Sequence, residues 1–313
     1  MNKIFIDGQA GTTGLQIQKR MENRSDIELL SIDPEYRKSP KARQAVMQAA
    51  DIVILCLPDD AAREAVALMD DHTRVLDASS AFRVAKDWTY GLPELHPEQR
   101  KDISEAQRVS NPGCYATGFL LAITPLIAYQ LLPKDSLVSA HAVSGYSGGG
   151  RNLIERFQAQ AIGEQWHSRP YALTLNHKHL PEMQHYAQLE KSPLFAPSVG
   201  HYYQGMLVTI PLFREQLAFS SSITNLQEVI ADYYANEPCI RVHAVNDNAS
   251  LIDGYLDPES NNGSNRVDLF VFGNDRQMQI IARLDNLGKG ASGAAVQNIN
   301  LMLGTEELTS LET

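Results

Sequence analysis

The first half of the chain alternates short apolar stretches with amphipathic ones, and this alternation limits the folds open to it. The apolar stretches are residues 3–7, 27–32, 51–57 and 74–78, and helix-like sequence separates the first three. Strands that alternate with helices form a parallel sheet. Residues 52–57 are apolar without interruption, as expected for a central strand covered on both faces. We therefore predict an α/β domain of the Rossmann type.

The sequence changes character after about residue 129. Longer strands are predicted at residues 206–211 and 267–272, with a hairpin through residues 273–276. These features favour a second, α+β domain with a mixed or antiparallel sheet. Residues 286–303 have the pattern of a Gly-rich loop that leads into a helix, and such a helix could pack back onto the first domain.

Composition and charge exclude several classes of protein. With 313 residues, 43% of them hydrophobic, the chain can bury one large core or two ordinary ones. The formal net charge is -10 and the basic residues form no run, which argues against a nucleic-acid partner. The most apolar run, residues 118–128, is too short to cross a bilayer. Because the chain enters its first strand directly, we expect no secretory signal and a cytoplasmic location.

The three cysteines are Cys56, Cys114 and Cys239. Their odd number and wide spacing support neither a disulfide framework nor a metal site of paired cysteines. Each is expected to be a thiol in a reducing compartment. Cys56 lies inside the apolar strand and is predicted to be a core residue.

A glycine-rich turn follows the first strand. Gly8, Gly11 and Gly14 are spaced G-x-x-G-x-x-G, with Thr12 and Thr13 between the last two. Exposed backbone N–H groups and a helix dipole at such a turn favour a phosphate. The spacing departs by one residue from the commoner G-x-G-x-x-G, so a plain turn is the alternative. The position after the first strand favours a dinucleotide.

The choice of cofactor is expected to depend on the end of the second strand. Ser31 and Asp33 precede Arg37 and Lys38 there. An acidic residue suits a ribose hydroxyl and NAD, whereas the basic pair suits the 2′-phosphate of NADP. A solvated basic pair on a loop is an equally fair interpretation.

Cys114 follows an Asn-Pro-Gly sequence and is predicted to begin a helix. At a helix N-terminus the dipole and unpaired N–H groups stabilise a thiolate, and the same donors can stabilise an oxyanion. We therefore predict that Cys114 is a nucleophile. Next to a nicotinamide site, a nucleophilic thiol indicates thioester chemistry in which a hydride releases an aldehyde.

A base for this cysteine is predicted near residue 179. His177 and His179 are followed by Pro181 and Glu182, and the proline suits the first turn of a helix beginning near Leu180. Glu182 could then orient His179. Metal binding is the rival interpretation, but a third ligand is missing from the pattern, so we predict no metal.

Taken together, these segments resemble the N-acetyl-gamma-glutamyl-phosphate reductase family, in its shorter form. The resemblance spans nearly the whole chain in the order of the family's motifs, and it rests on residues 8–14, 77–83, 90–94, 110–115, 147–151, 177–182 and 286–291.

The resemblance implies a fold like that of glyceraldehyde-3-phosphate and aspartate-semialdehyde dehydrogenases. An NADP-binding Rossmann domain would comprise residues 1–114 and 287–313, with the final helix returning to it. The inserted catalytic domain would comprise residues 115–286 and form homodimers or homotetramers.

The resemblance also implies a reaction, the NADPH-dependent reduction of N-acetyl-L-glutamyl 5-phosphate to the semialdehyde in arginine biosynthesis. Cys114 matches the nucleophile, and His179 with Glu182 matches the acid/base pair. Arg83 and Asn111 match phosphate contacts, a role that suits a bidentate guanidinium.

Two further loops are expected to hold the cofactor or an anion. The residues are Gly288 and Lys289 for the cofactor, and Ser147, Gly148 and Arg151 for the anion. For the second loop, a tight turn that caps the following helix is an equally fair interpretation. His201, in residues 200–205, is the reserve base.

Two alternatives stay open at this stage. Aspartate-semialdehyde dehydrogenase or an aminoadipyl-phosphate reductase would keep nearly all of the catalytic residues. A non-catalytic, nucleotide-sensing Rossmann protein would use Cys114 and the histidines as core residues.

Overall fold

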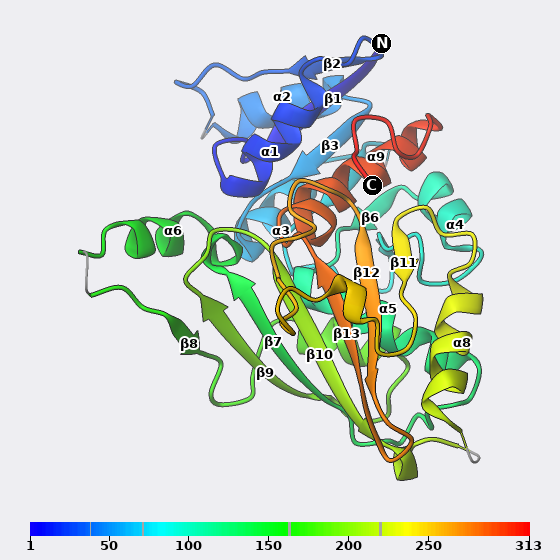
Figure 1. The fold of residues 1–313 in the computed structure, drawn as a ribbon. Coiled ribbons are helices and arrows are strands. Elements are labelled where there is room, and N and C mark those ends of the chain that lie inside the picture. Colours follow the sequence, from blue (N-terminus) through cyan, green and yellow to red (C-terminus); the bar gives the residue numbers. More distant parts are fainter. Residues whose placement is uncertain (38, 71, 162–163, 219–220) are drawn as a thin grey trace. The chain divides into compact units, whose positions relative to one another are not determined.

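The computed structural model describes residues 1–37, 39–70, 72–161, 164–218 and 221–313, so Lys38 of the predicted basic pair lies outside the described residues. The chain divides into two compact units (Figure 1). The first unit comprises Met1–Pro112 and Ala291–Leu311. The second unit comprises Gly113–Gly290 and Glu312–Thr313.

The sheet of the first unit has the strand order β2-β1-β3-β4-β6-β5, and its paired strands are parallel. This is the parallel sheet that the alternation of apolar stretches predicted. The strands are β1 (Asn2–Asp7), β2 (Ile27–Leu30), β3 (Ile52–Leu55), β4 (Arg74–Asp77), β5 (Thr89–Tyr90) and β6 (Arg108–Ser110).

Helices cover both faces of this sheet. Ile4 and Ile6 of β1 belong to a core that includes Ile299, whereas Phe5, between them, belongs to a second core with Met47. Successive strand residues point to opposite faces, so each face needs its own apolar cover. The helices are α1 (Thr12–Met21), α2 (Pro40–Ala49), α3 (Asp59–Ala67), α4 (Gln99–Glu105) and α9 (Gly293–Leu303).

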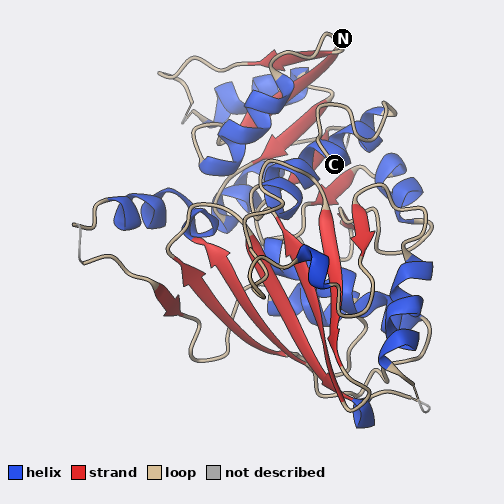
Figure 2. Cartoon of the chain, viewed as in Figure 1, coloured by secondary structure: helices blue, strands red, loops and turns tan. Residues whose placement is uncertain are grey.

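The sheet of the second unit has the order β11-β12-β13-β10-β7-β9-β8. Strands β12, β13 and β10 pair antiparallel, and β7 pairs with β9 in parallel, so the sheet is mixed, as predicted (Figure 2). The strands are β7 (Ser139–Gly145), β8 (Ser168–Pro170), β9 (Leu194–Gly200), β10 (Met206–Phe213), β11 (Ile240–Val242), β12 (Val267–Gly273) and β13 (Gln277–Leu284).

Helix α5 (Cys114–Ala128) is the buried helix of the second unit. It packs on β10 and β13, and a Cβ at Gly118 would lie 2.9 Å from Cγ2 of Val208 and 3.3 Å from Cδ2 of Leu284. Gly118 therefore lets the helix approach the sheet closely. The other helices are α6 (Gly150–Gln158), α7 (Leu180–Tyr186) and α8 (Ile223–Tyr233), with short helical turns η1 (Tyr146–Gly149), η2 (Arg214–Gln216), η3 (Asn248–Ser250) and η4 (Gly288–Ser292).

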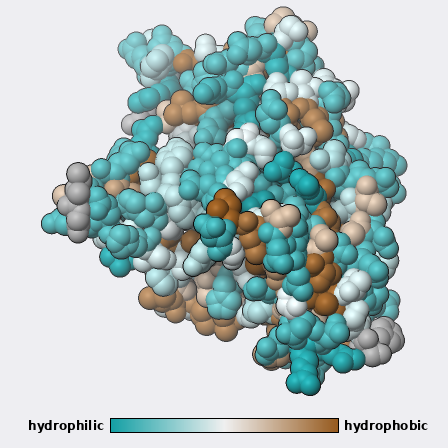
Figure 3. All heavy atoms as spheres, viewed as in Figure 1, coloured by the Kyte–Doolittle hydropathy of each residue, from teal (hydrophilic) through white to brown (hydrophobic). Residues whose placement is uncertain are grey.

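The surface and the helices of the described residues were compared with what a membrane protein would show. Hydrophilic residues dominate the face shown in Figure 3, in keeping with the net charge of -10. None of the helices in the described ranges combines the length and the apolar character needed to span a membrane.

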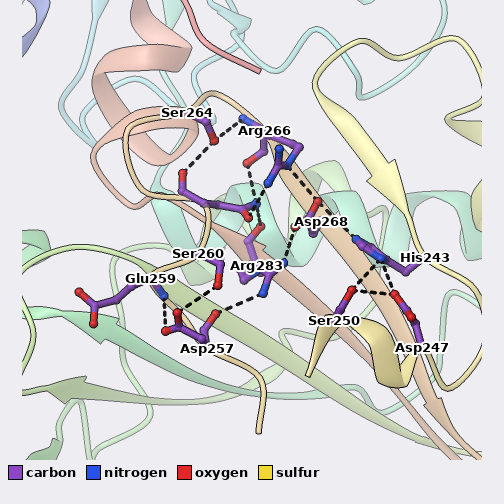
Figure 4. A network of polar contacts seen from close by, with 11 residues as sticks. His243, Asp247, Ser250, Asp257, Glu259, Ser260, Ser264, Arg266, Asp268 and Arg283 are labelled. Atoms are coloured by element: carbon purple, nitrogen blue, oxygen red, sulfur yellow. Dashed lines mark hydrogen bonds and ion pairs between the residues drawn. The ribbon is translucent and has the colours of Figure 1, made fainter. Parts of the chain in front are cut away.

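A buried polar network holds the loop after β11 against the second sheet (Figure 4). Asp268 and Arg283 are register partners on β12 and β13, and Arg283 Nη2 lies 2.7 Å from Asp268 Oδ2. Arg266 Nε lies 3.1 Å from the other carboxylate oxygen. His243 lies between two acids, with Nδ1 2.8 Å from Asp247 and Nε2 3.4 Å from Asp268. The charges of this network therefore largely compensate one another.

The network fixes the ionisation of Asp268. Burial raises the pKa of this carboxyl, but hydrogen bonds from His243 and Arg283 and the charges of both arginines outweigh burial and lower the pKa to about 2. An acid whose pKa is lower in the folded state stabilises the fold above its unfolded value. That contribution is lost as the pH falls from about 4 towards 2.

Asp268→Asn should lower the free energy of unfolding by about 2 kcal/mol at pH 7, because the buried Arg283 and the partly exposed Arg266 lose their carboxylate. The difference from the wild type should shrink as the pH falls below about 4, because Asp268 then takes up a proton in the unfolded wild-type chain. Urea unfolding followed by circular dichroism from pH 7 to pH 3 measures this. The same substitution at the exposed Asp135 is the control. A pH-independent difference would contradict the assignment.

Candidate active site

The glycine-rich turn runs from the end of β1 to the start of α1. Gly8 has φ +89°, and a Cβ there would lie 2.3 Å from the carbonyl oxygen of Cys56. A Cβ at Gly14 would lie 2.7 Å from the carbonyl oxygen of Gly8. Both positions therefore need glycine, because the turn lies directly against the end of β3.

The N-terminus of α1 fits a phosphate group. Its N-cap is Gly11, which makes no side-chain capping hydrogen bond, and the first turn, with Thr12 and Thr13, contains no acidic residue. Backbone N–H groups and the helix dipole at such an end attract an anion. The turn thus has the shape and the donors that a dinucleotide pyrophosphate requires.

The loop after β2 carries the residues predicted to select the cofactor. Ser31 and Arg37 are exposed on it. The carboxylate of Asp33 accepts a hydrogen bond of 2.9 Å from the backbone N–H of Glu35, so it closes its own turn. Sequence reasoning missed Arg43, whose Nε lies 3.0 Å from the Asp7 carboxylate at the end of β1. No local signal links two residues this far apart in the sequence.

Cys114 is the first residue of α5, as predicted. Among residues 109–123 it alone is not buried. Its N-cap, Gly113, makes no side-chain capping hydrogen bond, so the backbone N–H groups of the first turn can face a bound group. A thiolate is stabilised at such a helix end.

The other two cysteines have different surroundings. Burial, reinforced by the charges of Asp77 and Asp7, raises the pKa of the Cys56 thiol to about 12. Cys239 is completely buried. Cys56 is partly exposed like Cys114, but its raised pKa keeps it protonated. Nucleophilic cysteine chemistry needs an accessible thiolate, so Cys114 is the candidate.

A glycine makes room for Cys114. A Cβ at Gly290 would lie 2.7 Å from the Cβ of Cys114. The N–H of Gly290 donates to the carbonyl of Asp285 at 2.9 Å, which holds this backbone in place. Sequence reasoning did not name Gly290, because only the fold brings it to Cys114.

Glu182, on α7, forms a hydrogen bond to the start of α5, the helix that begins at Cys114. Its Oε2 accepts a hydrogen bond of 3.1 Å from the backbone N–H of Gly113, the residue before Cys114. Glu182 is almost completely buried and belongs to the first turn of α7, which begins at Leu180 as predicted. His179 is the N-cap of the same helix. That Glu182 also orients the ring of His179 stays a prediction.

Two histidines and two tyrosines form a cluster beside the start of α5. The N–H of His179 donates to Nδ1 of His177 at 3.1 Å, so this nitrogen carries no proton and Nε2 faces the hydroxyl of Tyr171 at 3.4 Å. The Tyr171 hydroxyl donates to that of Tyr115 at 3.1 Å. The rings of Tyr115 and His179 lie 5.8 Å apart. The cluster thus reaches the residue next to Cys114.

The tyrosines of this cluster stay protonated. Burial raises the pKa of Tyr115 and of Tyr171, and the charge of Cys114 raises both further. Sequence reasoning missed both residues. Tyr115 could have been found from the sequence, because it directly follows Cys114. Tyr171 is distant in the sequence, and only the fold places it beside Tyr115.

Asn286 fixes the loop that carries Ser147, Gly148 and Arg151, the residues predicted to contact an anion. Its Nδ2 donates to the Ser147 hydroxyl at 2.9 Å, and its Oδ1 accepts from the N–H of Gly205 at 2.7 Å. Ser147 is buried, Gly148 lies in η1, and Arg151 is exposed at the start of α6. These positions are compatible with a helix-leading turn and with an anion contact.

His201, the reserve base, lies in different surroundings from His179. It is exposed, and its ring lies 6.3 Å from that of Tyr146 and 5.8 Å from that of Phe157. The structure therefore groups His179, rather than His201, with Tyr115.

The predicted phosphate residues meet within the first unit. Arg83 Nε donates to the carbonyl of Asn111 at 3.1 Å, and Arg83 is buried. The side chain of Asn111 donates to the carbonyl of Ala291 at 3.0 Å and accepts from Asn298 at 3.2 Å. Both residues are held firmly, as a phosphate subsite requires.

Gly288 and Lys289, predicted to contact the cofactor, are buried in η4. A Cβ at Gly288 would lie 2.3 Å from the carbonyl oxygen of Ser264, so this glycine is needed for packing within the second unit. A cofactor role for either stays a prediction. Within the described ranges, no group of three His, Cys, Asp or Glu side chains could hold a metal ion.

Comparison with known proteins identifies the family. A model described as "Semialdehyde dehydrogenase, NAD binding domain" matches residues 8–103, and one described as "Semialdehyde dehydrogenase, dimerisation domain" matches residues 114–286. The N-acetyl-gamma-glutamyl-phosphate reductase 2 of Nostoc sp. is 49% identical over 97% of this chain and 98% of its own. The reductase of Allorhizobium ampelinum is 48% identical over 96% and 98%. The chain belongs to the N-acetyl-gamma-glutamyl-phosphate reductase family.

Solved structures of more distant proteins share the fold of this reductase family member. An aspartate semialdehyde dehydrogenase from Francisella tularensis matches with a TM-score of 0.72 at 15% identity, over 96% of this chain and 99% of its own. An aspartate semialdehyde dehydrogenase with NADP from Candida albicans matches with a TM-score of 0.62 at 13% identity, over 97% and 99%. The predicted fold class is confirmed, and the dimerisation-domain match supports self-association.

Iodoacetamide at pH 8 should alkylate Cys114 at least about tenfold faster than the other two cysteines, because the reactive species is an accessible thiolate. Peptide mass spectrometry of samples quenched over time measures the three rates. Cys114→Ser should remove the fast phase and leave the slow one. Fast labelling of Cys56 would refute this account of the three thiols.

Proposed function

We propose that the chain reduces N-acetyl-L-glutamyl 5-phosphate to N-acetyl-L-glutamate 5-semialdehyde, with NADPH as the reductant and inorganic phosphate as the second product. One observation carries the proposal. A partly exposed cysteine begins a buried helix whose N-cap N–H is held by Glu182, in a chain 49% identical to a reductase named for this substrate.

Acyl transfer to sulfur comes first. His179 accepts the thiol proton of Cys114, and the thiolate attacks the acyl carbon. The N–H groups at the start of α5 hold the oxyanion. As the carbonyl re-forms, the bond from carbon to the phosphate oxygen breaks, and a thioester remains. Arg83 and Asn111 hold the departing phosphate, which takes a proton from solvent.

Reduction of the thioester completes the reaction. When bound, NADPH supplies the hydride that converts the thioester carbonyl into a thiohemiacetal. His179 lends its proton to the alkoxide oxygen and takes it back as the carbon–sulfur bond breaks. Cys114 leaves as a thiolate, and the aldehyde is released. The half-buried His177 accepts a hydrogen bond from the backbone N–H of His179 and contacts its ring, and Tyr171 contacts His177 in turn, so His179 is held in place.

The first unit carries the residues suited to the dinucleotide. The turn from Gly8 to Gly14 would hold the pyrophosphate, and the two threonines at the start of α1 would add donors. Arg37 and Lys38 would hold the 2′-phosphate of NADP. The likeness to a structure titled with NADP supports this choice over NAD.

Self-association is proposed to use the second unit. The dimerisation-domain match covers residues 114–286. Pro211 and Phe213 of β10, Phe272 of β12 and Met278 of β13 line a groove of about 370 Å³ at one end of the sheet. A homodimer or homotetramer would cover the sheet surface around it.

The reaction is tested in reverse. Purified protein should reduce NADP with N-acetylglutamate semialdehyde only when phosphate is present, as followed at 340 nm. Aspartate semialdehyde is the competing substrate. Faster turnover of aspartate semialdehyde would replace the proposed substrate, and absence of turnover with either would remove the enzymatic function.

His179→Asn should lower kcat by roughly 10² to 10⁴, the usual effect of losing a general acid/base, with little change in the KM for phosphate. His201→Asn is the matched control and should keep kcat within about threefold, because His201 lies against Tyr146 and Phe157. If kcat falls by orders of magnitude in His201→Asn and only slightly in His179→Asn, the base is His201.

Replacing both Arg37 and Lys38 by alanine should raise the KM for NADPH at least about tenfold and leave the KM for NADH nearly unchanged, because NADH has no 2′-phosphate. Initial rates with each nucleotide measure the split. Equal losses with both nucleotides would show that another group selects the cofactor.

A further inference from the structure

Asp77 is a buried acid that the proposed reaction does not use. It ends β4, between β3 and β6, and is inaccessible to solvent. Its Oδ2 accepts a hydrogen bond of 2.6 Å from the Ser79 hydroxyl. Its Oδ1 has no hydrogen-bond partner among the residues that the structure describes. Such a half-satisfied buried carboxylate costs free energy, so its presence needs an explanation.

Hydrogen bonds lead from Asp77 towards Arg83 along the chain. The Ser79 hydroxyl that donates to Asp77 also accepts from the N–H of Ala81 at 3.1 Å. This pair of bonds fixes the turn from which the chain reaches Arg83, two residues later. The carboxylate of Asp77 therefore anchors the start of the segment that carries the guanidinium.

Asp77 also contacts Asn111, the other residue proposed to hold phosphate. The N–H of Asn111 donates to the backbone carbonyl of Asp77 at 2.7 Å. Arg83 Nε in turn donates to the carbonyl of Asn111 at 3.1 Å. Hydrogen bonds thus link Asp77 to Asn111 and Asn111 to Arg83 inside the first unit.

The turn does not need Asp77 simply to fold. Asp59, at the start of α3, accepts from the N–H of Ser80 at 2.9 Å and from its hydroxyl at 2.8 Å. A partly exposed acid therefore already anchors the middle of the same turn. A second, fully buried acid adds a cost that stability alone does not explain.

Charges of both signs surround this carboxyl. Burial raises the pKa of Asp77 to about 6, hydrogen bonds from Ser79 and the charge of Arg83 oppose that rise, and the charge of Asp59 adds to it. The Cys56 thiol, just after β3, is a further titratable neighbour and stays protonated because its own pKa is about 12. Asp77 is therefore ionised at pH 8 and largely protonated below pH 6.

We propose that Asp77 is a positioning residue for phosphate, whose ionised carboxylate holds the Ser79–Ala81 turn and draws Arg83 into place against the phosphate group of the substrate. The proposal rests on the proposed function of Arg83. Protonation of Asp77 removes the negative charge that attracts Arg83 and weakens the acceptor of the Ser79 hydroxyl. The affinity for phosphate then falls as the acid is neutralised.

Asp77→Asn mimics the protonated acid at every pH and tests the idea. At pH 8 the KM for phosphate in the reverse reaction should rise about tenfold, with the KM for the aldehyde and the KM for NADP within about twofold. The ratio of the phosphate KM of the variant to that of the wild type should fall towards 1 below pH 6. Protonation of phosphate itself affects both proteins equally and cancels in this ratio.

Two further variants keep the test decisive. Ser79→Ala removes the same link without touching the buried acid, so it should also raise the phosphate KM if Asp77→Asn does not fold. Asp87→Asn, at an exposed position of the same unit, is the matched control and should match the wild type. A ratio above 1 that does not change with pH would reduce Asp77 to a structural role, and an unchanged phosphate KM at pH 8 would overturn the proposal.

Calorimetric titration with inorganic phosphate separates this inference from the reaction. If the wild type binds phosphate but turns over neither aldehyde, the proposed function fails and the Asp77 comparison still proceeds by binding. If Asp77→Asn binds phosphate as tightly as the wild type at pH 8, the inference fails while the reaction stands.

Discussion

The N-terminus of α5 is the constraint on which the site depends. This helix is buried along its length, and Gly118 lets it lie directly on β10 and β13. Its first turn cannot move without disturbing that packing, because protein interiors are close-packed. The hydrogen bond from Gly113 to Glu182 and the close approach of Gly290 to Cys114 then fix this cysteine from two more directions. The packing of the core thereby holds Cys114 in one position.

Burial and neighbouring charges set the protonation states of the cysteines and of the buried aspartates in this protein. Burial and the charges of two nearby acids raise the pKa of Cys56 to about 12 and keep that thiol protonated, whereas Cys114 lies at the start of a helix, in the field of its dipole. Asp268 and Asp77 are both buried acids, yet their pKa values are about 2 and about 6. Two arginines and a histidine compensate the first. The second has one arginine and a hydroxyl, too little to offset its burial.

Much of the fold could be predicted from sequence because its signals are local. Apolar stretches placed the strands near residues 3–7 and 206–211, and the Pro-Gly turn placed the start of α5 at Cys114. The second strand was predicted two residues too long, through Ile32, whereas β2 ends at Leu30. Apolar character continues past the point where pairing with β1 stops, and sequence does not record where a partner strand ends.

For the site, the sequence by itself determined that Cys114 begins a helix, where the glycine-rich turn lies and where α7 starts, because backbone conformation and a helix dipole arise from neighbouring residues. Only the tertiary structure decided which groups meet them. Glu182 caps Gly113, Tyr171 reaches His177, and Gly290 faces Cys114. Contacts of this kind depend on how packed helices and strands bring distant segments together. Their geometry is a property of the core, and no spacing in the sequence encodes it.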